Sequence, residues 1–125
     1  MNTTYSLTQT RFSLFGSEVL KILPMLKEGG IPASLVDQFM RSAASVGANY
    51  AEARGAESTA DFLHKLQIAL KECREAKHWL IMFKETPTVP QRAMAMLLGE
   101  CDALCGILYQ SVKTTRERLD KGQKG

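Results

Sequence analysis

Apolar side chains recur at intervals of three and four residues in four long segments of this 125-residue chain. That spacing puts them on one face of an α-helix, so each segment is predicted to be a helix with one buried stripe. The predicted helices span about residues 8–27, 32–54, 59–84 and 89–119. Their stripes consist of Phe12, Phe15, Val19, Ile22 and Leu26; Val36, Phe39, Ala43, Val46 and Tyr50; Phe62, Leu66, Ala69, Cys73, Ala76, Leu80 and Phe83; and Met94, Leu98, Cys101, Cys105, Leu108 and Val112. No segment alternates with period two, so strands are not indicated.

Glycine and proline mark the boundaries around the first two helices. Gly29 and Gly30 separate them, and Pro32 stands where a helix can begin because the amide at that position would be unpaired anyway. Pro24 lies inside the first pattern and is expected to kink that helix or to end it early.

Side-chain caps are predicted for the other two helices. Ser58 with Asp61, and Thr88 with Gln91, resemble capping boxes that offer acceptors to unpaired amides of the first turn. All the connections are short, which favours antiparallel neighbours. The chain is therefore predicted to be all-α, a single up-down-up-down four-helix bundle over residues 1–125 with a basic C-terminal tail.

No targeting or membrane segment is evident. Residues 1–10 are polar and lack a basic stretch followed by an apolar one, so a secretory signal is not expected. No apolar run approaches the roughly 20 residues that span a bilayer. We therefore expect a cytoplasmic protein without membrane contact.

Candidate catalytic or metal-binding residues are few. The three cysteines are expected to be free thiols packed as small apolar groups. Cys101 and Cys105 lie one turn apart, but no third and fourth ligands accompany them at useful spacing. Glu75 and His78 resemble half of a di-iron site, which would need a second such pair on another helix. The prediction is a protein that is not an enzyme and has no cofactor or metal.

The positive charge is concentrated at the C-terminus. Acidic and basic residues balance through residue 110, so the net charge of +3 arises from the tail. Its cations include Lys113, Arg116, Arg118 and Lys121. They could attract phosphate backbones or acidic partners. Alternatively, they complement the negative end of the last helix and keep it in solution.

The second predicted helix carries a polar stripe roughly opposite its apolar one. The stripe consists of Gln38, Arg41, Ser45, Asn49 and Glu52. Small residues surround it, and small side chains let another helix approach while the polar groups bond across the contact. This face is either an exposed helix surface or a subunit contact or ligand-facing surface.

Further apolar residues widen the faces of the last two helices. They are Leu63, Leu70, Ile81, Leu97, Leu104 and Tyr109. Burial between subunits and a broad core face are both consistent with them.

The second and third helices carry a familiar pattern. Residues 38–52 read QFMRSAASVGANYAE, and Ser58, Asp61-Phe62, Ile68-Ala69 and Glu75 follow. This pattern resembles the bacterial four-helix bundle family of 23S rRNA intervening sequence proteins over about residues 35–80. The chain departs from the family at Gly47, where proline is frequent, and at Ala53, where glycine is frequent. The second helix is therefore expected to run on toward Gly55.

The resemblance implies a homo-oligomer, with a pentameric barrel as the expected form, and no established catalytic activity. Related accessory proteins of diversity-generating retroelements bind a reverse transcriptase and nucleic acid. We therefore expect a non-enzymatic scaffold that binds RNA, DNA or a nucleic-acid enzyme such as a reverse transcriptase. The alternative is a protein–protein adaptor without nucleic-acid binding. The expected phosphate contacts are Lys113, Arg116, Arg118 and Lys121, followed by Arg41 and Arg54, and the expected subunit contacts are the polar stripe of residues 38–52.

Overall fold

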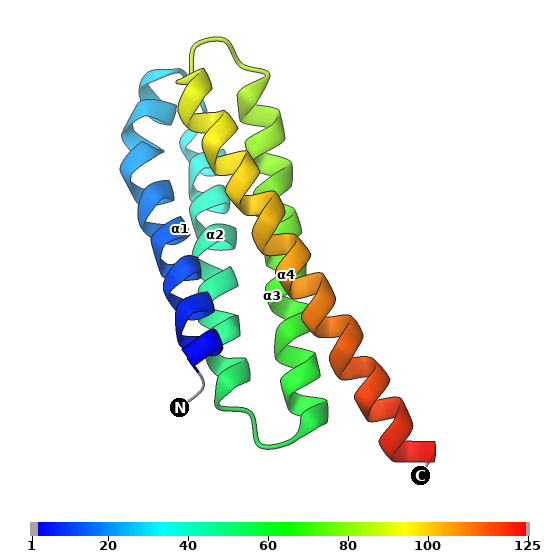
Figure 1. Ribbon diagram of the computed structural model, residues 1–125. Coiled ribbons are helices and arrows are strands. Elements are labelled where there is room, and N and C mark those ends of the chain that lie inside the picture. Colours follow the sequence, from blue (N-terminus) through cyan, green and yellow to red (C-terminus); the bar gives the residue numbers. More distant parts are fainter. Residues whose placement is uncertain (1–2, 125) are drawn as a thin grey trace.

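The computed structural model describes residues 3–124, with side chains from residue 6 to residue 122, and contains four helices. They are α1 (Thr3–Glu28), α2 (Ala33–Arg54), α3 (Thr59–Lys84) and α4 (Gln91–Lys124). Each helix packs against its neighbours in sequence, and α4 closes the ring against α1 (Figure 1). The predicted up-down-up-down bundle is confirmed. None of the described helices has the length and apolarity needed to cross a membrane.

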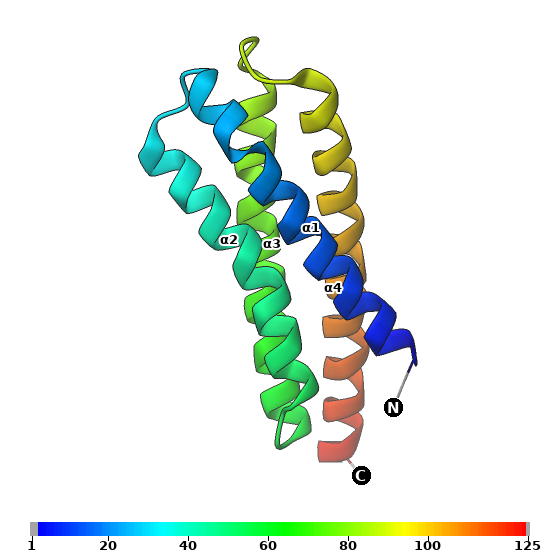
Figure 2. The same ribbon diagram turned by 90° about the vertical axis from the view of Figure 1, so that its left-hand side faces the viewer.

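Two helices are longer than predicted. α1 begins at Thr3 rather than near residue 8, and α4 continues to Lys124 rather than ending near residue 119. The prediction followed the apolar stripes, which stop before the helices do, and no proline interrupts either extension. In Figure 2, α4 runs alongside α3, whereas α1 crosses α4 at an angle.

The expectation that Pro24 ends α1 early is wrong, because the helix continues through it to Glu28. Pro24 and Leu20 are both exposed, so the carbonyl that lacks an amide partner lies on the solvent side of α1. The helix is terminated instead by the turn at Gly30, whose φ of 87° favours glycine. The amide of Gly30 bonds to the Lys27 carbonyl at 3.0 Å and that of Ile31 to the Leu26 carbonyl at 3.1 Å, a Schellman ending.

The ends of α2 and α3 follow the predictions. α2 ends at Arg54 with Gly55 as its cap, in keeping with the expected continuation past Ala53. At the start of α3, Ser58 Oγ accepts a hydrogen bond from the amide of Asp61 at 3.0 Å, as a capping box requires. The Asp61 carboxylate accepts from the amide of Glu57 at 3.3 Å rather than from that of Ser58.

The predicted cap formed by Thr88 and Gln91 is wrong. The Thr88 hydroxyl donates to the carbonyl of Gly29, 59 residues away in sequence, and Gln91 Nε2 donates to the carbonyl of Thr86 at 3.0 Å. Thr88 therefore joins the α3–α4 connection to the α1–α2 turn at one end of the bundle. A side chain at position 29 would lie 3.0 Å from the Thr88 carbonyl oxygen, so glycine permits this approach.

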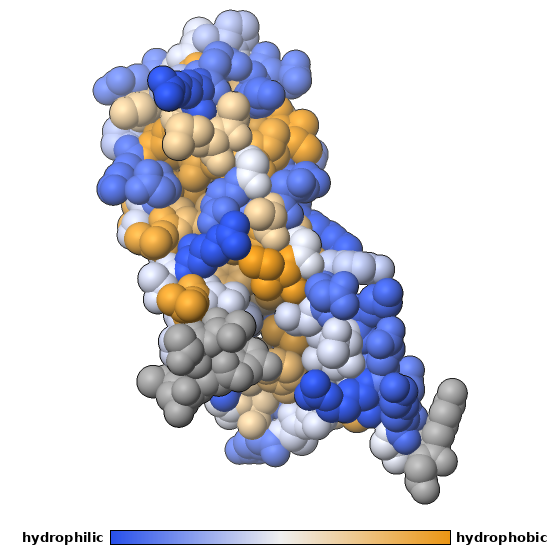
Figure 3. All heavy atoms as spheres, viewed as in Figure 1, coloured by the Kyte–Doolittle hydropathy of each residue, from blue (hydrophilic) through white to orange (hydrophobic). Residues whose placement is uncertain are grey.

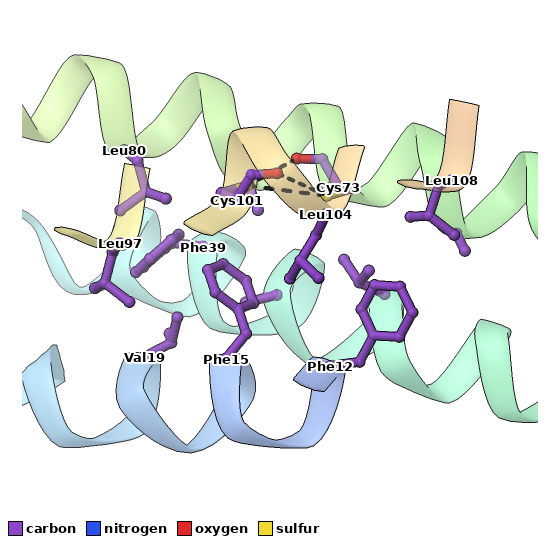
Figure 4. Packing of buried hydrophobic residues seen from close by; sticks show 14 of the residues in the cluster. Phe12, Phe15, Val19, Phe39, Cys73, Leu80, Leu97, Cys101, Leu104 and Leu108 are labelled. Atoms are coloured by element: carbon purple, nitrogen blue, oxygen red, sulfur yellow. Dashed lines mark hydrogen bonds between the residues drawn. The ribbon is translucent and has the colours of Figure 1, made fainter. Parts of the chain in front are cut away.

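The apolar stripes form the core, with a small rotation of α3 and α4 (Figure 4). Three stripe residues, Phe62, Leu98 and Cys105, are only half-buried. Four residues assigned to the widened faces are instead part of the core, namely Leu63, Leu70, Leu97 and Leu104. A broad core face therefore accounts for most of that widening, while Ile81 and Tyr109 remain exposed.

α1 and α2 approach closely at Gly47. A Cβ atom there would lie 3.3 Å from Phe12 Cβ, and Gln9 Nε2 donates to the Gly47 carbonyl at 3.2 Å. The rings of Phe12 and Tyr50 pack beside this crossing with centroids 4.7 Å apart. At this position, the small residue of α2 serves a contact within the chain.

We expect Gly47→Leu to lower the free energy of unfolding by about 1–3 kcal/mol, because the added side chain overpacks the crossing with Phe12. Urea unfolding followed by circular dichroism measures the change. The control is Gly99→Ala, since an added Cβ there meets no atom within 4 Å. This control should stabilise the helix by about 0.5–1 kcal/mol. Equal stabilisation by both substitutions would contradict the close approach.

Candidate functional site

The cations of the C-terminal tail do not form one patch. Lys113, Arg116, Arg118 and Lys121 are all exposed on α4. Arg116 faces α3, whereas Arg118 borders a separate hollow that also includes Phe62. The expected set of phosphate contacts is therefore divided around the helix.

A basic groove lies between α3 and α4 and has a volume of about 400 Å³. Its lining consists of Gln67, Leu70, Lys71, Arg74, Tyr109, Val112 and Arg116. Three cations thus converge from two helices, beside a tyrosine that is 53% exposed. Of these residues, only Arg116 was among the predicted contacts. Lys71 and Arg74 were missed because each is an ordinary helix-surface residue until α4 is packed against α3.

Two side chains of the polar stripe of α2, those of Asn49 and Glu52, have partners inside the chain. Gln38 and Arg41 are exposed. Asn49 Nδ2 donates to the carbonyl of Ser45 at 2.8 Å, and Glu52 forms an ion pair with Lys65 of α3 at 3.1 Å.

The other two expected phosphate contacts, Arg41 and Arg54, lie exposed on α2. The described parts of α2 and α4 make no close backbone contact. These two arginines therefore lie on α2, which does not line the basic groove between α3 and α4.

A second groove, the apolar groove, follows the seam between α1 and α4, where the two helices touch sparingly. Its volume is about 360 Å³, and its lining includes Leu14, Met25 and Met96. These side chains are 60%, 48% and 68% exposed, respectively. Apolar surface gathers over the upper parts of α1 and α4, and hydrophilic surface follows the lower part of α4 (Figure 3).

Sequence reasoning missed the apolar groove because its exposed residues lie off the periodic stripes. Apolar residues on the outer sides of the first and last helices were the available signal. One end of the groove is bounded by Glu100, which accepts two hydrogen bonds from Arg11 at 2.7 and 2.9 Å. Clustered apolar side chains of this kind usually mark an interaction surface.

The three cysteines meet between α3 and α4. The Cys73 sulfur lies 3.9 Å from that of Cys101 and 3.0 Å from that of Cys105, and all three sulfurs lie within 4.8 Å of one another. The expectation that no third ligand accompanies Cys101 and Cys105 is wrong, because the facing stripe of α3 supplies Cys73. All three are free thiols, and the buried pair fills core positions as expected. Among the described residues, Glu75 and His78 join no potential metal-binding group.

The thiols differ strongly in acidity. Hydrogen bonding with Cys101 and Cys73, together with the positive charge of Lys77, lowers the pKa of Cys105 to about 4. Hydrogen bonding with Cys105 raises the pKa of Cys101 to about 12, and hydrogen bonding with Cys101 and Cys105 raises the pKa of Cys73. Lys77 is held nearby by its ion pair with Asp102. Of the three thiols, Cys105 is therefore the one favoured as the thiolate.

The family model for the 23S rRNA-intervening sequence protein matches residues 15–110. The chain belongs to this family. A similar solved structure is that of a protein of unknown function from the S23 ribosomal protein family of Bacteroides thetaiotaomicron. It has a TM-score of 0.78 and 27% sequence identity, and the match covers 85% of this chain and 98% of that chain. A search of curated proteins finds no match.

Family membership confirms the resemblance found in residues 38–52. The matched region includes Lys71, Arg74 and Tyr109 of the basic groove. Lys113, Arg116, Arg118 and Lys121 lie beyond it. These four tail cations therefore lie outside the region matched by the family model.

We expect iodoacetamide to alkylate Cys105 before Cys73 or Cys101, because Cys105 is half-buried whereas the other two are fully buried. Its lowered pKa keeps the thiolate present at neutral and mildly acidic pH, so the rate should change little between about pH 6 and pH 8. An ordinary thiol slows by about tenfold per unit as the pH falls below its pKa of about 8.5.

Mass spectrometry of the alkylated peptides measures the three rates. The urea-unfolded chain is the control, in which all three thiols should react with ordinary pH dependence. A tenfold decrease per pH unit at Cys105 in the folded protein would contradict the assignment of the charge.

Proposed function

We propose that this chain is a non-enzymatic, self-assembling scaffold that binds nucleic acid through the basic groove. The observation that carries the proposal is the convergence of Lys71, Arg74 and Arg116 beside the exposed ring of Tyr109. Phosphate groups are attracted by clustered cations, and an exposed aromatic ring can stack on an unpaired base. Single-stranded RNA or DNA fits this combination best, because its bases are free to stack.

An enzyme that acts on nucleic acid, such as a reverse transcriptase, is a second kind of partner. It would present the bound strand to the groove, so that the scaffold contacts the nucleic acid and the enzyme together. Family membership names no activity for this chain, so the proposal rests on the basic groove.

We expect the triple substitution Lys71→Gln, Arg74→Gln and Arg116→Gln to weaken binding of a single-stranded oligonucleotide by at least about tenfold at low salt. The slope of log affinity against log salt should become shallower by about 2, because roughly three phosphate contacts are lost. Fluorescence anisotropy over a salt series measures both quantities.

The matched control substitutes Lys27, Lys84 and Arg92 with Gln, which removes the same charge from exposed positions outside the groove. This control should bind nearly as the unchanged protein does. Replacing Lys113, Arg118 and Lys121 with Gln should have an intermediate effect. Equal loss in all three variants would show that binding follows net charge alone and would overturn the choice of site.

Substitutions of Tyr109 distinguish base stacking from charge attraction as the source of affinity. Tyr109→Ala should weaken single-strand binding by about 1–3 kcal/mol, whereas Tyr109→Phe keeps the ring and should change little. If neither RNA nor DNA binds at low salt, the alternative of a protein–protein adaptor is favoured, and the apolar groove becomes its contact surface.

Self-assembly is supported by the apolar groove rather than by the polar stripe of α2. Leu14, Met25 and Met96 expose apolar surface on adjacent helices, whereas Asn49 and Glu52 already have partners inside the chain. A pentameric ring is the form that the family resemblance implies, and in such a ring the apolar groove of each subunit would contact a different surface of its neighbour. The bundle seam of α1 and α4 would then lie at the subunit contact.

We expect Leu14→Glu with Met96→Glu to reduce the mass in solution toward that of one chain, because two carboxylates would have to be buried at the contact. Light scattering after size exclusion measures the mass, and circular dichroism checks that helix content is unchanged. The control pair, Gln38→Glu with Arg41→Glu, alters the polar stripe and should leave the mass unchanged. The reverse result would return the subunit contact to α2.

A further inference from the structure

The cysteine cluster has no part in the proposed binding role. Cys73, Cys101 and Cys105 are all the cysteines in the chain, and α3 and α4 bring them to one point. Figure 4 shows Cys73 and Cys101 facing each other between these helices, with Leu104 and Leu80 nearby. Cysteines that only fill a core have no need to meet, since each could be satisfied by apolar neighbours.

The spacing of the sulfurs fits a single metal ion. Two of the separations are 3.0 and 3.9 Å, and the third is at most 4.8 Å. A point equidistant from all three sulfurs then lies about 2.0–2.4 Å from each, which matches the metal–sulfur distance of about 2.3 Å in thiolate sites. An ion could enter with side-chain shifts of less than about 1 Å.

The donor set selects the kind of ion. All three ligands are soft thiolates, and in the described part of the chain no histidine or carboxylate joins the group. Zinc sites are almost always four-coordinate and tetrahedral, so with three sulfurs zinc would need a water as its fourth ligand. Cu(I) is soft, favours thiolates and accepts three of them without a fourth ligand.

We propose that Cys73, Cys101 and Cys105 together bind one Cu(I) ion per chain in a three-coordinate site between α3 and α4. Cys105 enters as the thiolate, the S–H bonds of Cys73 and Cys101 are broken, three S–Cu bonds form, two protons pass to solvent, and copper stays in the +1 state. The loaded site carries a net charge of −2. The ammonium of Lys77, on the turn after Cys73, offsets part of that charge.

Access to the site is from the side of Cys105. Cys73 and Cys101 are fully buried, whereas Cys105 is half-buried. The Lys77–Asp102 ion pair lies on the same side and is exposed to solvent. Cys105 is therefore the least buried of the three ligands.

The test uses the full chain, reduced and free of oxygen, with Cu(I) supplied against a coloured Cu(I) chelator. We expect one tightly held ion per chain and, in Cys105→Ala, a loss of affinity of at least about 100-fold. The matched control is Ser111→Ala, a half-buried α4 position outside the cluster, which should bind as the unchanged protein does. Copper-edge X-ray absorption should show three sulfur neighbours at about 2.3 Å.

A second measurement needs no substitution and so does not depend on the folding of a variant. One equivalent of Cu(I) should protect Cys105 of the unchanged protein from iodoacetamide. Equal affinity in Cys105→Ala would overturn the site, as would two sulfur neighbours instead of three. Formation of a Cys73–Cys105 disulfide with no copper retained would overturn it as well.

Discussion

Packing of α3 against α4 is the contact on which the rest of the molecule depends. The apolar stripes of the two helices meet along the core, where Leu80 and Leu104 are fully buried. The same packing brings Cys73 to Cys101 and Cys105 on one line of contact and Arg74 to Arg116 along another. A single pairing of helices therefore builds the core, the thiol cluster and the basic groove.

The four helices and their order could be predicted from sequence because helical periodicity reports directly which face is buried. Periodicity does not fix the rotation of each helix to better than one side chain. Leu63 therefore replaces Phe62 in the core, and Leu97 replaces Leu98. Whether two residues far apart in sequence meet depends on the register between helices. For this reason the third cysteine could not be placed beside the other two.

Prediction of the candidate site from the sequence is limited in the same way, because the site depends on how the helices pack. Arg116 could be identified from a local excess of positive charge in the sequence. Lys71 and Arg74 become part of a basic groove only because α4 packs beside them. The polar stripe of α2 was conspicuous in sequence, yet Glu52 is paired with Lys65 and Asn49 with its own helix. The least closely packed seam, between α1 and α4, instead exposes the larger apolar surface.

The hydrogen bond from Thr88 to Gly29 gives the bundle two unlike ends. At one end the α1–α2 turn and the α3–α4 connection act as a single tied unit, so a change in the length of either loop would disturb both helix pairs. At the other end, the α2–α3 connection around Glu57 is exposed and makes only local backbone hydrogen bonds. Changes in loop length, inserted domains and attached labels should therefore be tolerated at the α2–α3 end and rejected at the tied end.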